Sequence, residues 1–321
     1  MAQPAQNTGG RRKNIAPRRG LRSARVQPIR PESGDRRVAR GGSGLSEATA
    51  SASPAAAPRE TAVELAGVGV AFGAGQNAFR AVGRVDLAVA PHEFVAIVGP
   101  TGCGKSTLLN VVAGLLAPVE GEARVFGRPV RGVTREAGYL FQQDALMPWK
   151  TALDNVAVAL EVGGVARAAA LARARDWLAR VGLSGFEARY PHQLSGGQKK
   201  RVALAQMLIR DPKILLMDEP FGPLDAQTRA LMGDVLLDLW SADRKAVLFV
   251  THDLEEAIAL ADRVVVMSAG PAARLVSQHV VDLPRPRDAN EVRLEPRFHA
   301  LQKAIWEDLR AEVLKTYGRA S

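Results

Sequence analysis

The nine residues from Gly99 to Thr107 have the types and spacing of a loop that binds phosphate groups. Their glycines let successive backbone N–H groups turn toward one centre, which larger side chains would obstruct. Lys105 adds a full positive charge for the β- and γ-phosphates of a nucleoside triphosphate, and the Ser106 hydroxyl is placed to hold Mg²⁺. The predicted triphosphate site therefore consists of Gly99, Pro100, Thr101, Gly102, Cys103, Gly104, Lys105, Ser106 and Thr107.

The segments on either side of this loop are those that a phosphate-binding loop needs. The apolar run Phe94–Val98 predicts a buried parallel strand, and Leu108–Leu116 predicts an amphipathic helix. The N-terminus of such a helix adds partial positive charge to the N–H groups of the loop. A strand, a glycine-rich turn and a helix in this order indicate that the chain binds a nucleoside triphosphate.

A second group of polar residues is expected at the same edge of the sheet. The apolar run Ile214–Met217 ends in Asp218 and Glu219, and ligands bind at the carboxyl ends of parallel strands. One carboxylate there can hold Mg²⁺, and the other can orient or deprotonate an attacking water. The run Ala246–Val250 delivers His252 to this edge, where we favour a contact with the γ-phosphate over a purely structural role.

A further anion-binding helix start is predicted at Leu194-Ser195-Gly196-Gly197-Gln198. A serine and two glycines stand where a helix from Lys199 to about Ile209 begins. A plain capped helix would be the default interpretation of this stretch taken alone. Two anion-binding helix starts in a chain with one phosphate loop therefore say more about function than either does alone.

Charge separates a basic N-terminal extension from the rest of the 321 residues. Residues 1–60 hold 12 Lys and Arg and 4 Asp and Glu, so they carry +8 of the net charge of +10. Residues 1–58 are rich in Gly, Ser, Pro, Ala and Arg, which predicts disorder. We favour a solvated extension over contact with anionic lipid or nucleic acid, and over an organelle transit peptide, which its Arg-rich composition also resembles.

Three classes of protein are excluded by the remaining composition. Cys103 is the single cysteine, so no intramolecular disulfide framework is possible. No run approaches the 18 apolar residues of a membrane span, and the N-terminus lacks the apolar core of a secretory signal.

The other strands and helices follow from apolar spacing. Strands are predicted at Val63–Phe72, Val85–Val89, Gly121–Val125, Ala137–Phe141, Arg263–Met267 and Arg274–Val281. Helices are predicted at Ala152–Glu161, Ala166–Val181 and 226–241, and from Pro296 onward with an apolar stripe. The first two of these helices form an all-helical insertion between strands of the core.

Together these motifs resemble those of the ATP-binding subunits of ABC transporters, from about Thr61 to Tyr317. GPTGCGKST is similar to the Walker A motif, ILLMDEP to the Walker B motif, and LSGGQ to the ABC signature, which other P-loop ATPases lack. Single positions match the aromatic A-loop residue, the Q-loop glutamine, the D-loop aspartate and the switch histidine: Phe72, Gln142, Asp225 and His252.

The resemblance implies an α/β fold: a P-loop NTPase (RecA-like) core with a helical subdomain, about residues 143–205, and an antiparallel β subdomain. The ATPase domain would span 59–296 and a C-terminal helix 297–321. ATP and Mg²⁺ are the implied cofactors. Catalytic roles fall to Glu219 as base and to His252, Gln142 and Lys105, and the implied metal ligands are Ser106, Gln142 and Asp218. Phe72 would stack on the base, although a core phenylalanine is an equally good interpretation.

The resemblance also implies partners. Two copies would form a head-to-tail sandwich, in which Ser195, Gly196, Gly197, Gln198 and Asp225 of one copy reach the ATP that the other copy holds on Lys105. Integral membrane permease subunits would dock on the helical insertion near Met147, Pro148 and Trp149, and a substrate-binding protein would act through the permease. No specific nucleic acid is expected.

The run ALMPWKTALDNV and the C-terminal segment look like importers of nitrate, alkanesulfonates and taurine. The implied function is ATP-driven uptake of such an anion, from the cytoplasmic face of the inner membrane. Departures from the family's pattern are Lys199-Lys200, where Gln/Arg-rich sequence is common, and Gln206, where arginine is common.

Two other functions are alternatives to the importer subunit. One is a soluble ABC ATPase of DNA repair or translation, and the other is a nucleic-acid-binding protein acting through the basic extension.

Overall fold

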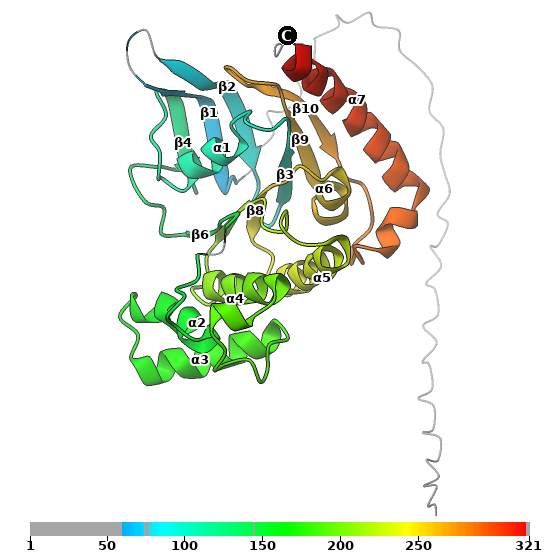
Figure 1. The fold of residues 1–321 in the computed structure, drawn as a ribbon. Coiled ribbons are helices and arrows are strands. Elements are labelled where there is room, and N and C mark those ends of the chain that lie inside the picture. Colours follow the sequence, from blue (N-terminus) through cyan, green and yellow to red (C-terminus); the bar gives the residue numbers. More distant parts are fainter. Residues whose placement is uncertain (1–59, 74, 76–77, 144, 319–321) are drawn as a thin grey trace, which may run out of the picture. The chain divides into compact units, whose positions relative to one another are not determined.

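The computed structural model describes residues 60–73, 75, 78–143 and 145–318. The predicted basic extension, residues 1–58, and the end of the predicted C-terminal helix, 319–321, lie outside this part of the chain. Two sheets and a set of helices make up the described residues, as Figure 1 shows.

A six-stranded sheet carries the strand ends at which the predicted polar residues emerge. Its order is β10-β9-β3-β8-β7-β6, parallel except that β10 runs antiparallel to β9. Apolar side chains fill β3 and β8 because helices or the second sheet cover both faces. The strands are β3 Phe94–Val98, β6 Ala137–Leu140, β7 Ile214–Asp218, β8 Ala246–Val250, β9 Arg263–Met267 and β10 Leu275–Val280.

A four-stranded antiparallel sheet packs beside it, in the order β2-β1-β4-β5. Its inner side chains share one apolar core with the α1 helix and with one face of β3, including Val63, Ile97 and Leu109. The predicted strand Val85–Val89 is the second half of a longer β2, because residues from Phe79 also pair with β1. The elements are β1 Val63–Phe72, β2 Phe79–Val89, β4 Glu120–Val125, β5 Arg128–Pro129 and α1 Lys105–Val112.

The chain between β6 and β7 forms the helical insertion. It contains α2 Ala152–Glu161, α3 Arg167–Arg180, the short 3₁₀ helix η2 Pro191–Gln193 and α4 Gly196–Leu208. Val156, Leu178 and Val202 belong to a core of its own, whereas Leu204 on α4 packs into the main core. Helix α4 therefore joins the insertion to the sheet. The predicted domain boundaries stay predictions.

Three helices and a 3₁₀ turn complete the described chain: α5 Ala226–Ala242, α6 Leu254–Leu260, η3 Glu291–Leu294 and α7 Pro296–Gly318. The predicted apolar stripe of α7 is buried at Phe298, Leu301, Ile305 and Leu309, where the helix packs along α6, β9 and β10. No helix among the described residues is long and apolar enough to cross a membrane.

Asn155 holds the turn that leads into the insertion. It is fully buried, its Oδ1 accepts the Met147 N–H at 2.7 Å, and its Nδ2 donates toward the carbonyls of Met147 and Lys150 at 3.1 and 3.0 Å. Replacing Asn155 by Ala should lower the free energy of unfolding by about 2–4 kcal/mol, because several backbone groups lose their partners. Urea denaturation measures the change. Asn290→Ala, at an exposed position, should cost under about 0.5 kcal/mol, and equal losses would contradict the assignment.

Candidate active site

The phosphate-type loop lies between β3 and α1, at the carboxyl edge of the parallel strands. Gly102 and Gly104 have φ angles of +76° and +98°, which side chains rarely tolerate. A Cβ on Gly104 would also lie 2.7 Å from Cγ2 of Val82, so glycine is required there twice over. Helix α1 begins with no side-chain cap, which leaves its first N–H groups available to an anion.

Lys105 is only 6% exposed and folds back over the loop. Its ammonium donates hydrogen bonds to the carbonyls of Gly99 and Pro100, at 3.0 and 3.1 Å. Within the described residues no carboxylate forms an ion pair with it. A buried charge that forms no ion pair within the described part of the chain suits a multiply charged anion.

Ser106 and Asp218 form a corner that fits Mg²⁺. The Ser106 hydroxyl donates to Asp218 Oδ1 at 2.8 Å. Burial raises the pKa of Asp218, and the neighbouring Glu219 charge acts in the same direction, against the Ser106 hydrogen bond. A divalent cation would offset the repulsion between the Asp218 and Glu219 charges, and hard oxygen donors suit Mg²⁺. Among the described residues no cluster of three or more His, Cys, Asp or Glu is found.

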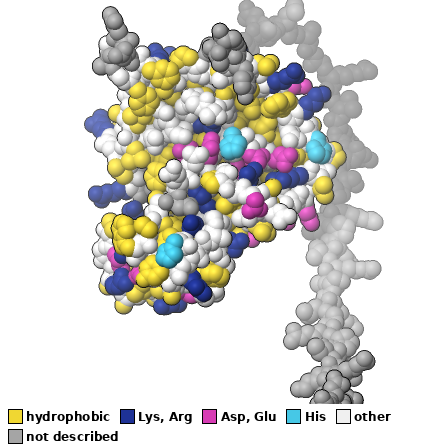
Figure 2. Space-filling model, in the orientation of Figure 1, with side chains coloured by type: hydrophobic (Ala, Val, Ile, Leu, Met, Phe, Trp, Pro, Cys, Tyr) yellow, Lys and Arg dark blue, Asp and Glu magenta, His cyan; other side chains and the backbone are white. Residues whose placement is uncertain are grey.

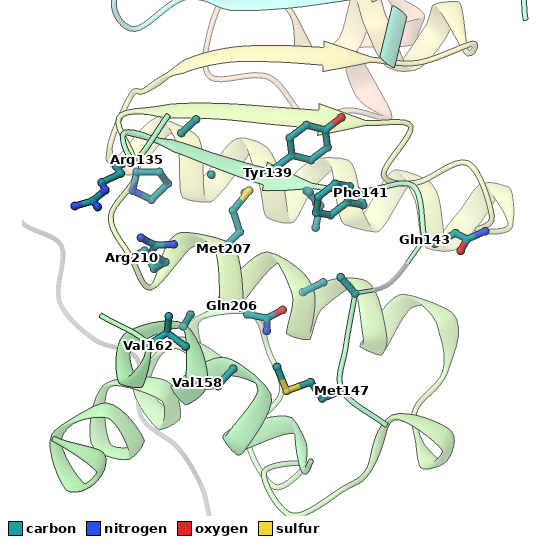
Figure 3. A pocket seen from close by; sticks show the side chains of 17 residues that line it. Arg135, Tyr139, Phe141, Gln143, Met147, Val158, Val162, Gln206, Met207 and Arg210 are labelled. Carbon is teal, nitrogen blue, oxygen red and sulfur yellow. The ribbon is translucent and has the colours of Figure 1, made fainter. Parts of the chain in front are cut away.

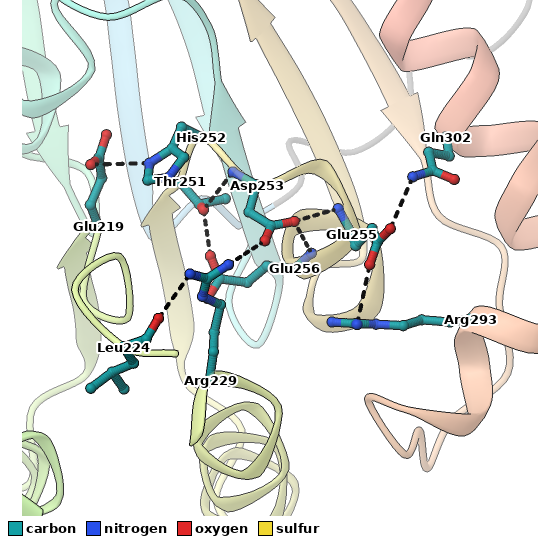
Figure 4. A network of polar contacts seen from close by, with 10 residues as sticks. All are labelled: Glu219, Leu224, Arg229, Thr251, His252, Asp253, Glu255, Glu256, Arg293 and Gln302. Atoms are coloured by element: carbon teal, nitrogen blue, oxygen red, sulfur yellow. Dashed lines mark hydrogen bonds and ion pairs between the residues drawn. The ribbon is translucent and has the colours of Figure 1, made fainter. Parts of the chain in front are cut away.

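Glu219 follows the last residue of β7 and is the meeting point of three elements. Its φ is +42°, an uncommon value for a residue with a side chain, and its N–H donates to Val250 O at 2.9 Å. Its Oε2 accepts from Gln142 Nε2 at 3.2 Å and lies 3.3 Å from His252 Nδ1. Figure 4 shows the histidine ring facing the carboxylate. Figure 2 shows acidic side chains beside a histidine in the middle of this face.

Gln142 was predicted both as a catalytic residue and as a metal ligand. The structure places its amide on Glu219, one residue beyond the Ser106–Asp218 corner. Its part in catalysis and in metal binding stays a prediction, and its side chain contacts Glu219 in the structure.

Phe72 ends β1 and is 45% exposed, so it is not a core phenylalanine. Phe79, which the sequence analysis did not select, pairs with it across the strands and is 51% exposed. The β2 strand then runs past the phosphate loop, where Val82 faces Gly104. Both rings are therefore candidates to stack on a base, and the signal for Phe79 was an aromatic residue just beyond the glycine-rich turn.

The signature residues form the start of α4. Ser195 caps the helix by accepting the Gln198 N–H, and Gln198 in turn accepts the Ser195 N–H at 2.9 Å. The cap engages the third N–H of the helix, so those of Gly196 and Gly197 remain to face an anion. A Cβ on Gly197 would lie 2.6 Å from Cγ2 of Thr228, so this glycine lets α4 approach α5.

Asp225 is the N-cap of α5 and accepts the Thr228 N–H at 2.9 Å, a backbone hydrogen bond that lowers its pKa. Since Gly197 meets the same Thr228, Asp225 and the signature lie side by side in one chain. The structure thus brings the predicted residues together in two groups. One contains the phosphate loop with Asp218, Gln142, Glu219 and His252, and the other contains Ser195–Gln198 with Asp225.

A polar network behind His252 was not predicted from the sequence. Asp253 caps α6 and forms an ion pair with Arg229 of α5 at 2.8 Å, while the Thr251 hydroxyl donates to Glu256 (Figure 4). Burial raises the pKa of Glu256 to about 7, with Asp253 acting in the same direction and Arg229 against it. The network ties α5 to the loop that carries the histidine.

Known proteins are similar to this chain in sequence and in fold. A family model described as "ABC transporter" matches residues 82–222. An uncharacterized ABC transporter ATP-binding protein of Methanocaldococcus jannaschii is 45% identical over 240 residues, 75% of this chain and 88% of that protein. The taurine import ATP-binding protein TauB of Burkholderia thailandensis is 43% identical over 249 residues, 76% of this chain and 95% of that protein. The dimeric post-hydrolysis structure of the ATP-binding cassette MJ0796, bound to ADP and Pi, gives a TM-score of 0.62 at 32% identity, covering 69% of this chain and all of that one.

Replacing Glu219 by Gln should abolish ATP turnover and leave ATP binding intact. The amide keeps the shape of the side chain but can no longer accept a proton from water, and loss of a general base costs about 10²- to 10⁴-fold. Phosphate release and the binding of a fluorescent ATP analogue measure the two effects. Glu219→Gln protein that hydrolyses ATP at the wild-type rate would exclude Glu219 as the base.

Glu256→Gln should change the pH dependence of stability. With a folded pKa of about 7 and an unfolded value of about 4.3, Glu256 binds a proton in the folded state over a range where the unfolded chain has lost it. The free energy of unfolding of the wild type therefore falls as pH rises through this range. Relative to wild type, Glu256→Gln should gain up to about 3 kcal/mol between pH 5 and pH 8.

Urea denaturation at a series of pH values measures this difference. Glu255→Gln, on the same helix but with a half-exposed side chain, is the matched control and should show a smaller change. A constant difference between Glu256→Gln and wild type across the range would refute the assignment.

Proposed function

Because the chain belongs to the ABC transporter family of ATP-binding proteins, we propose that it is the ATP-hydrolysing subunit of an importer for a small anion. The candidate cargoes are taurine, alkanesulfonates and nitrate. The observation that carries the choice of cargo is the 43% identity to a taurine import ATP-binding protein over 95% of that protein. The proposal that the chain hydrolyses ATP is supported by the geometry of the site around Glu219.

In this proposal the chain acts by positioning and by electrostatic stabilisation, as phosphoryl transfer requires. Lys105 and the N–H groups at the start of α1 hold the β- and γ-phosphates, and Ser106 and Asp218 hold Mg²⁺, which neutralises developing charge. Glu219 orients a water for attack and accepts its proton. Gln142 and His252 fix the Glu219 carboxylate from either side.

A second copy of the chain completes the site. The start of α4 offers backbone N–H groups and partial positive charge, and the similar solved structures are described as dimeric. We place Ser195 and Gly197 of each copy on the γ-phosphate held by Lys105 of the other. Binding of ATP then stabilises the closed dimer and hydrolysis releases it, which is a population shift controlled by a ligand.

The membrane permease docks in a groove between the sheet and the helical insertion. A cavity of about 380 Å³ lies there, lined mainly by apolar side chains. Figure 3 shows Tyr139 and Phe141 on one side and Met147 and Val158 on the other. Trp149, in the turn after Met147, is 74% exposed and offers an aromatic anchor beside the groove. This arrangement links the permease to Gln142, which immediately follows Phe141.

These partners place the chain at the cytoplasmic face of the inner membrane, with a substrate-binding protein delivering the anion to the permease. The alternative of a soluble ABC ATPase in DNA repair or translation is not favoured. Such proteins generally carry a long coiled-coil insertion or a second cassette, whereas the described chain between β6 and β7 holds only α2, α3, η2 and α4.

Deleting the gene in its own organism tests the cargo. We expect the deletion strain to lose uptake of one labelled anion among taurine, an alkanesulfonate and nitrate, and growth on that anion as the sole sulfur or nitrogen source. Growth on sulfate and ammonium should be unchanged, and the wild-type gene should restore uptake while the Glu219→Gln gene should not. Unchanged uptake of all three anions would refute the proposed cargo class.

A further inference from the structure

Lys200 is a buried cation for which the proposed mechanism has no role. It stands in the second turn of α4, directly after the signature residues, and its side chain is 2% exposed. A buried ammonium is costly unless polar groups receive it. The Lys200 ammonium donates to the carbonyl of Gln142 at 2.7 Å and toward that of Phe141 at 3.4 Å.

The segment that Lys200 contacts, residues 141–143, forms no helix or strand, and its side chains are exposed. Helix α4 is packed into both the core of the insertion and the main core. Lys200 therefore attaches an irregular segment to a well-packed helix through its backbone.

Gln142 contacts Lys200 through its backbone and Glu219 through its side chain. The Lys200 ammonium donates to the Gln142 carbonyl, and the Gln142 side-chain amide donates to Glu219 Oε2 at 3.2 Å. A continuous chain of contacts thus runs from α4 to Glu219. A cavity lined by Gln142, Gly196, Lys200 and Leu224 brings the start of α4 and this segment to one hollow.

We propose that Lys200 is a positioning residue that fixes the backbone of Gln142 relative to the start of α4, and thereby sets the place of the Gln142 amide on Glu219. A shift of α4, whether imposed by a second copy on the signature or by a partner in the groove, then moves Gln142 and changes the rate of hydrolysis. This inference rests on the proposed ATPase function and deepens it, and it does not depend on the cargo.

Steady-state ATP hydrolysis by the purified full chain tests the proposal. Lys200→Met keeps the length of the side chain but removes the ammonium, and we expect kcat to fall about 10- to 100-fold. KM for ATP should stay within about threefold, since the loop 99–107 is untouched. Lys199→Met is the matched control: it removes the same charge one residue earlier, where the described contacts include none to Gln142, and it should keep the wild-type kcat.

A double-mutant cycle separates positioning from a general structural role. If Lys200 acts through Gln142, the double variant Lys200→Met/Gln142→Ala should be no slower than Gln142→Ala alone, and Lys200→Arg should recover part of the activity. Multiplicative losses in the double variant, or a Lys200→Met protein as active as Lys199→Met, would overturn the proposal. Should Lys200→Met fail to fold, as judged by thermal unfolding, Lys200→Gln is tested in the same cycle with the same criteria.

The failure of this inference is distinguishable from failure of the proposed function. Wild-type protein that hydrolyses no ATP would refute the ATPase, and unchanged anion uptake in the deletion strain would refute the cargo. Normal hydrolysis by both lysine variants would refute only the role of Lys200.

Discussion

A nucleoside triphosphate concentrates its negative charge on linked phosphates, and the chain offers two separate sets of backbone N–H donors for such charge. One set lies at the start of α1 and the other at the start of α4, and Figure 1 places these helices in different parts of the molecule. Each set depends on glycines that packing enforces, because Val82 crowds Gly104 and Thr228 crowds Gly197. Neither start has an acidic residue in its first turn, so each retains its positive end for an anion.

Glu219 connects the two regions. It takes an uncommon backbone conformation directly after β7, so that its carboxylate meets Gln142 from the β6 edge and His252 from the end of β8. Behind it, Arg229 and Asp253 tie the histidine loop to α5, whose cap, Asp225, lies beside the signature. In the proposed mechanism, movements of either α4 or α5 would therefore change hydrolysis at Glu219. This is the property that a motor needs if a partner is to control its rate.

The sequence predicted the parts of this arrangement that depend on local patterns. The phosphate loop, the strand ends at Asp218 and His252 and the cap at Ser195 are each recognisable within about ten residues, because strand, turn and helix start have their own chemistry. The strand before Val85 was missed because residues 79–84 are held by pairing with β1 and are not apolar enough to predict a strand.

Contacts between residues distant in the sequence were not predictable in this way. The sequence analysis selected neither Glu256 nor Arg229; Glu256 is buried and Arg229 is partly buried where α5 packs against α6. Lys200 drew attention only as a departure from the family's pattern, and its contact with Gln142 spans 58 positions.

The most direct test of the account asks whether one copy completes the site of another. Light scattering of Glu219→Gln protein should give twice the mass of one chain with ATP and Mg²⁺ and a single-chain mass without ATP. A single-chain mass in both conditions, at ATP concentrations that saturate binding, would contradict it.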